Sequence, residues 1–85
     1  MRLPVIKHIR SFVVENDQDF LEEAIEVLEH LSESSAIKDE ELDVIGELIS
    51  NMHGALEVSQ MVADGDSEKD ALNKFMKRVT GSIDT

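Results

Sequence analysis

The chain has 85 residues, which suits one domain, and we assign residues 1–85 to a single domain. Apolar residues make up 41% of it but aromatic residues only 4%, so we expect an aliphatic core and no base-stacking surface for nucleic acid. Nineteen acidic residues against eight lysines and arginines give a net charge of −11, which repels phosphate backbones and anionic membranes. The lack of cysteine excludes disulfides, thiolate metal sites and cysteine nucleophiles.

No targeting or membrane-spanning segment is expected. Lys7, His8 and Arg10 interrupt the apolar residues near the N-terminus, so they do not form the core of a signal peptide. No stretch approaches the roughly 18 consecutive apolar residues that a membrane-spanning helix needs. We therefore expect a cytoplasmic protein that binds neither membranes nor nucleic acid.

Apolar residues at helical spacing predict a first helix from about Pro4 to Glu15, because proline fits the first turn of a helix. Asn16 or Asp17 is expected to cap a second helix that ends near residues 32–35. One side of this second helix carries apolar residues, namely Phe20, Leu21, Ala24, Ile25, Val27, Leu28 and Leu31. Its other side carries an acidic face of four glutamates, Glu22, Glu26, Glu29 and Glu33.

The third helix is predicted to be the longest, from about Asp39 to Ala63, and to end where Gly65 adopts a left-handed conformation. Its apolar arc is broad, which predicts contact with more than one neighbouring helix. The main stripe consists of Leu42, Ile45, Leu48, Ile49, Met52, Leu56 and Ala63, and the arc is extended by Val44, Ala55 and Val62. Asp66 or Ser67 is expected to cap a fourth helix that Gly81 closes. The pattern therefore predicts an all-α fold, a compact bundle of four helices with the long third helix at its centre, which self-associates.

Charge is unevenly distributed along the chain. Residues 1–10 hold three bases and no acid, residues 11–68 hold seventeen acids and one base, and residues 69–85 hold four bases and two acids. Two interpretations follow from this pattern. The cationic end helices balance the acidic middle within the chain, or the acidic face binds a basic partner protein.

Metal binding is the alternative for the acidic and histidine residues. Glu26 and His30 are i, i+4 neighbours, and His53 could join them as a third ligand. The four glutamates, however, lie opposite the apolar stripe, whereas metal sites in helical bundles project inward. We therefore predict a solvated acidic face, a packed His53, and neither metal nor cofactor.

Small residues recur every four positions in the third helix, at Gly46, Ser50 and Gly54, and would form a groove that another helix can approach closely. That helix could belong to the same chain or to a second copy, and the spacing does not distinguish the two. A chain this small gains stability when it buries a shared apolar face, so we favour a dimer. Val58 and Met61 could belong to its interface.

No catalytic motif is present: no serine lies in a Gly-x-Ser-x-Gly turn, and there is no glycine-rich phosphate loop. The opening LPVIKH, the stretch KDEELDVIGELISNM at residues 38–52 and the ending ALNKFMKRV with GSID resemble a family of small, acidic, all-helical bacterial proteins of unknown function. The resemblance implies no catalytic residue and no ligand.

We expect a non-catalytic protein-interaction module that self-associates through apolar helix faces and binds a partner through its acidic face. The alternative is a helical bundle that binds a metal or a small ligand through carboxylates and histidines. A third possibility is mimicry of nucleic-acid charge, in which the acidic surface occupies the basic groove of a DNA-binding protein.

Overall fold

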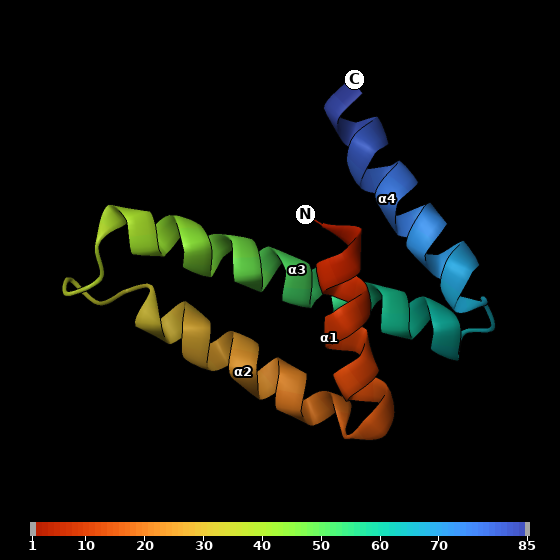
Figure 1. Cartoon of the computed structure of the whole chain (residues 1–85), viewed down its shortest axis with the longest axis horizontal. Coiled ribbons are helices and arrows are strands. Elements are labelled where there is room, and N and C mark those ends of the chain that lie inside the picture. Colours follow the sequence, from red (N-terminus) through yellow and green to blue (C-terminus); the bar gives the residue numbers. More distant parts are fainter. Residues whose placement is uncertain (1, 85) are drawn as a thin grey trace.

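The computed structural model describes residues 2–84, with side chains described for residues 2–80, and this part of the chain forms four helices and no strand. They are α1 (Leu3–Glu15), α2 (Gln18–Leu31), α3 (Asp39–Ala63) and α4 (Glu68–Asp84). The helix α3 is the longest and packs against each of the other three (Figure 1). The predicted all-α fold with a central third helix is confirmed.

Most helix boundaries follow the predicted signals. The Asp17 carboxylate accepts a hydrogen bond of 3.0 Å from the backbone N–H of Asp19, and the Ser67 hydroxyl accepts one of 3.1 Å from Asp70. Gly65 has φ +119°, a conformation that glycine adopts without strain, and it ends α3 as expected. The prediction for Gly81 is wrong, because α4 continues to Asp84. A glycine costs a helix only about 1 kcal/mol, which does not by itself end one.

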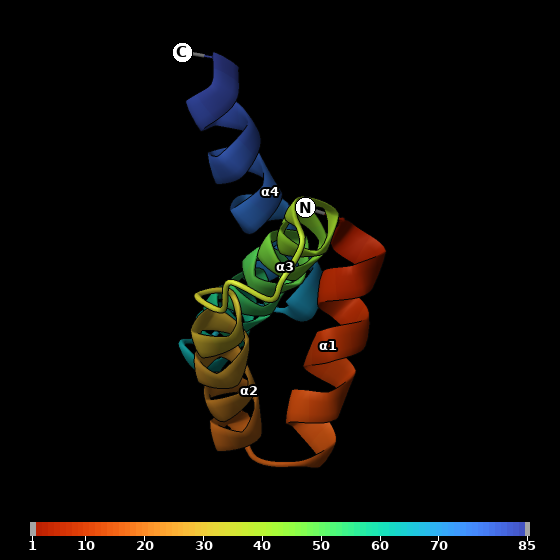
Figure 2. The ribbon, with the colours of Figure 1, turned by 90° about the vertical axis from the view of Figure 1, so that its left-hand side faces the viewer.

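The helices α2 and α3 run antiparallel and side by side, joined by the loop at residues 32–38 (Figure 1). The helix α1 crosses one side of α3 steeply, near the middle of α3, and α4 leaves the far end of α3 at a wide angle. Figure 2 shows α1 on one side of the α2–α3 pair, as a second layer that packs against α3. The molecule is therefore flat, with extents of 42 × 36 × 17 Å. Its radius of gyration is 13.8 Å, whereas a globular chain of this length has one of about 12 Å.

The centre of the core lies where α1 and α4 meet α3, and Leu21 and Ile25 of α2 extend it. Its fully enclosed side chains include Ile6 of α1, Val58 of α3 and Phe75 of α4. Between them lies Gly54, where a β-carbon would stand only 3.0 Å from the ring of Phe75 and 3.1 Å from the methyl group of Ile6. The missing side chain at this position therefore lets two helices approach α3 together.

Asn51 is fully buried and links α1 to α3. Its Oδ1 accepts a hydrogen bond of 3.0 Å from the backbone N–H of Arg2, at the start of α1, and its Nδ2 donates one of 2.8 Å to the carbonyl of Glu47. A buried amide needs such partners, because leaving it unpaired costs about 1–3 kcal/mol. No helix in the described part of the chain is long and apolar enough to cross a bilayer.

Candidate interaction surfaces

The small residues of α3 that were predicted to form a groove lie partly in the core and partly at the surface. Gly54 and Val58 are enclosed by the chain's own helices, and Met61 is half-buried against the core. Ser50 is half-buried, and Gly46 is exposed with no atom near the position of its missing β-carbon. Of the two explanations for this spacing, the intrachain crossing accounts for Gly54 and Val58.

Four glutamates are exposed, Glu22, Glu26 and Glu29 on α2 and Glu33 in the turn just after it, and we call these four residues the acidic ridge. The three on α2 each follow by one position a residue that is buried or half-buried, so they share one flank of the helix. Among side chains of residues 2–80, no lysine or arginine forms an ion pair with the ridge, and its one ionic contact is 3.8 Å between Glu33 and His30. The ridge is a dense, unneutralised negative surface.

Four bases near the two ends of the chain form ion pairs away from the ridge, namely Arg2, Arg10, Lys74 and Arg78. Arg2 lies 3.3 Å from Glu47, and Arg78 forms an ion pair with Glu57, so both ends of the chain attach to α3 through charge. The buried Arg10 lies 3.6 Å from Glu68, although its Nε makes no hydrogen bond. The basic residues of the end helices therefore neutralise acidic residues outside the ridge, and these ion pairs do not involve the ridge.

The alternative metal ligands are not brought together. Glu26 and His53 line one shallow hollow between α2 and α3, whereas His30 lines another beside Glu33. Within the described residues, no group of three or more histidine, cysteine, aspartate or glutamate side chains is placed to hold a metal ion. His53 is exposed rather than packed, because α2 leaves that side of α3 uncovered.

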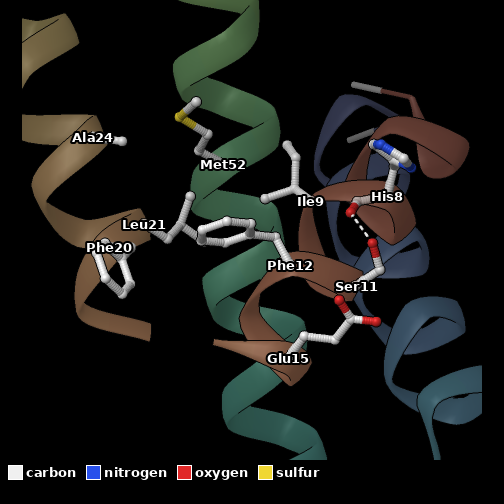
Figure 3. Close-up of a pocket in the computed structure, with 9 residues that line it drawn as sticks. All are labelled: His8, Ile9, Ser11, Phe12, Glu15, Phe20, Leu21, Ala24 and Met52. Atoms are coloured by element: carbon white, nitrogen blue, oxygen red, sulfur yellow. Dashed lines mark hydrogen bonds between the residues drawn. The ribbon is translucent and has the colours of Figure 1, made fainter. Parts of the chain in front are cut away.

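A groove between α1 and α2, with α3 as its floor, has a volume of about 570 Å³. Figure 3 shows Phe12 of α1 directed toward Leu21 of α2, and Met52 of α3 beside them. The rings of Phe12 and Phe20 meet edge to face at 6.0 Å between their centres. His8, Ser11 and Glu15 place polar groups along the α1 edge. This groove was not predicted from the sequence, although two of the three aromatic residues flank the α1–α2 turn.

Near the loop that joins α2 to α3, four residues of the predicted apolar stripes are exposed although we expected them to be buried: Val27 (65%) and Leu31 (42%) on α2, and Val44 (59%) and Leu48 (36%) on α3. That prediction was wrong because α1 crosses α3 steeply and covers only part of this side. Helical spacing makes neighbours of the two residues on each helix. The antiparallel arrangement sets the end of α2 beside the start of α3. We call these four residues the open face.

Both halves of the open face lie on the side that α1 crosses. On α2 its residues continue the stripe of Phe20 and Ala24, which line the groove below α1. On α3 they continue the stripe of Asn51, which hydrogen-bonds the start of α1. The open face and the groove are therefore neighbouring parts of one apolar side of the molecule.

Comparison with known protein families identifies the family of this chain. A family described as "Family of unknown function (DUF6952)" matches residues 1–84. The chain belongs to this family. Searches of curated proteins and of solved structures give no match. The resemblance to a family of unknown function is thus confirmed over nearly the whole DUF6952 chain.

Proposed function

We propose that this DUF6952 protein is a non-catalytic interaction module that self-associates through apolar helix faces and binds a basic partner protein through the acidic ridge. The observation that carries the proposal is the contrast between the two flanks of α2. One flank carries exposed apolar side chains, and the other carries three exposed carboxylates, followed by that of Glu33 in the turn after α2. Exposed apolar surface of this kind marks interaction sites, and a cluster of carboxylates attracts a cationic surface.

The apolar flank supports self-association. Soluble monomers rarely expose contiguous apolar surface beyond a few hundred Å², and larger patches mark interaction sites. Val27 and Val44 are each more than half exposed although they lie on helices that pack together. Burial of this surface by another molecule would supply stability that a flat chain of 85 residues does not obtain from its own core.

The acidic ridge supports a basic partner. Four clustered carboxylates, without a lysine or arginine paired with them in residues 2–80, create a negative potential that attracts a cationic surface and speeds its encounter. Such binding depends on charge and weakens as salt screens it. Because no lysine or arginine of residues 2–80 forms an ion pair with the ridge, the ridge is available to a partner.

The test is affinity capture at low salt with two variants of equal net charge. One variant changes all four ridge glutamates to glutamine, and the control changes Glu15, Glu40, Asp64 and Asp70 to their amides. We expect wild type and control to retain the same basic protein, and the ridge variant to lose it. Two results would contradict partner binding through the ridge. One is that the ridge variant still retains the basic protein, and the other is that the wild type retains no protein that added salt releases.

The groove between α1 and α2 favours a small apolar ligand as a second candidate function. Its volume of about 570 Å³ lies within the range of small-molecule sites. The substitution Ala24→Phe would fill the groove, and native mass spectrometry of untreated protein would then show loss of any co-purified ligand. Wild-type protein that carries no added mass and gains no melting temperature from apolar probes would argue against this function.

A further inference from the structure

We infer that the open face is occupied by a second copy of this chain, so that two α2–α3 hairpins pack together. This inference rests on the proposed self-association and identifies its surface. The starting observation is that both stripes have the spacing of a helix–helix seam. On α3, Val44, Leu48, Asn51, Ala55 and Val58 follow one another at intervals of four, three, four and three residues. On α2, Phe20, Ala24, Val27 and Leu31 follow at four, three and four.

The chain covers only part of the α3 seam and leaves most of the α2 seam exposed. Asn51, Ala55 and Val58 are fully buried beneath neighbouring helices, whereas Val44 and Leu48 in the same stripe are exposed. Because α1 crosses α3 steeply, it covers a length of α3 of only about one helix diameter, roughly 10 Å. The helix α2, in contrast, lies along much of the length of α3 (Figure 1). The uncovered half is long enough to take helices from another molecule.

The open face offers the kind of surface that a dimer buries. A stable interface buries about 800 Å² per partner, slightly more than half of it apolar. Together with Phe20, the open face supplies five large apolar side chains that are each 36–65% exposed. These side chains would form the apolar centre of the interface, and polar residues around them would form its rim.

A second copy fits because the surface is self-complementary. Two hairpins that present the same seam can pack about a two-fold axis, and their four helices then form a bundle with a common core. The acidic ridge lies on the opposite flank of α2, so it points away from this interface in both copies. A dimer therefore leaves the ridge free for a partner.

Charge predicts how the dimer responds to salt. Each copy carries a net charge of −11, and the exposed Glu23 and Glu47 lie at the edges of the two stripes. Two such copies repel one another, so added salt should strengthen their association. A basic partner on the same face would show the opposite dependence.

The experiment measures mass in solution by analytical ultracentrifugation over a wide range of concentration, at low and high salt. We expect a dimer that tightens with salt. Val44→Glu and Val44→Lys should both weaken it by about a hundredfold or more, because either charge would be buried in the interface. The matched controls Val14→Glu and Val14→Lys alter a valine on α1 that is 67% exposed and lies outside the open face, and should keep the wild-type mass.

Covalent coupling provides a second measurement that does not disturb folding. Because the chain has no cysteine, a single Val27→Cys substitution gives one reactive thiol. A short bismaleimide should join Val27→Cys chains into covalent dimers, and should leave Val14→Cys chains uncoupled. Circular dichroism checks that every variant remains helical.

The outcomes separate the inference from the proposed function. If wild-type protein stays monomeric at every concentration and salt, self-association itself is wrong, and the inference fails with it. If a dimer forms but survives both Val44 substitutions, or if Val14→Cys couples as fast as Val27→Cys, the open face is not its interface, and only the inference fails. If Val44→Glu alone dissociates the dimer, net repulsion rather than burial explains the effect, and the inference is again overturned.

Discussion

Two glycines of α3 have opposite surroundings. A β-carbon at Gly54 would meet Phe75 and Ile6 at distances shorter than ordinary contact, whereas one at Gly46 would meet nothing within 4 Å. Both glycines weaken the helix by the same backbone entropy. Only at Gly54 is that cost offset, because two neighbouring helices pack into the space.

These surroundings predict opposite effects for the same substitution. Gly54→Ala should lower the free energy of unfolding by about 1–3 kcal/mol, since Phe75 and Ile6 would have to move. Gly46→Ala should raise it by about 0.5–1 kcal/mol through helix propensity alone. Urea denaturation of both variants gives the comparison, and a stabilised Gly54→Ala would show that α1 and α4 are not seated on α3 as described.

Each of the other helices reaches α3 differently. The helix α2 lies along it, α1 crosses it and is fixed by the hydrogen bond to Asn51, and α4 leaves its far end. The attachment of α4 centres on Phe75, which is buried together with Ala71 and Leu72, while Met76 and Val79 pack beside them. Phe75 is the largest of the fully buried side chains, so its ring has a large share of the docking energy.

Phe75→Ala should therefore cost about 3–5 kcal/mol of unfolding free energy and should detach α4 from α3. The same change at Phe12, which is about half exposed, should cost about 1 kcal/mol. Hydrogen exchange would locate the loss, with amide protection falling in residues 71–80 more than in α2. Equal losses for the two phenylalanines, or protection that falls uniformly, would contradict this arrangement of the core.

At the scale of the whole molecule, repulsion among acids competes with the attraction of a few ion pairs. Nineteen acids face eight lysines and arginines, and the acidic ridge has no lysine or arginine against it in residues 2–80. The ion pairs of Arg2 and Arg78 are partly exposed and each contributes little. Repulsion should therefore dominate the dependence of stability on salt.

We expect added sodium chloride to raise the free energy of unfolding by on the order of 1 kcal/mol between low and physiological salt. The salt dependence of the free energy of unfolding should be measured on the Val44→Lys variant, so that self-association does not contribute. Replacing the four ridge glutamates with glutamine should reduce this dependence. A decrease of stability with salt would mean that the ion pairs between the end helices and α3 outweigh the repulsion.

The sequence by itself determined the helices, because their signals are local. Apolar spacing, the Asp17 and Ser67 caps and the left-handed Gly65 act over a few residues, and the acidic ridge follows from spacing within one helix. The family assignment of residues 1–84 also rests on sequence alone. The one boundary that failed, at Gly81, depended on a weak signal.

Only the tertiary structure decided which apolar residues are covered. Helical spacing identifies a stripe such as Val44, Leu48, Ala55 and Val58 but not how far another helix extends along it, since the crossing angle depends on side chains distant in the sequence. The steep crossing of α1 buried one half of that stripe and exposed the other, and opened the groove beside Phe12 and Phe20. The positions of α1 and α4 likewise bury Gly54 in the core, whereas Gly46 lies at the surface.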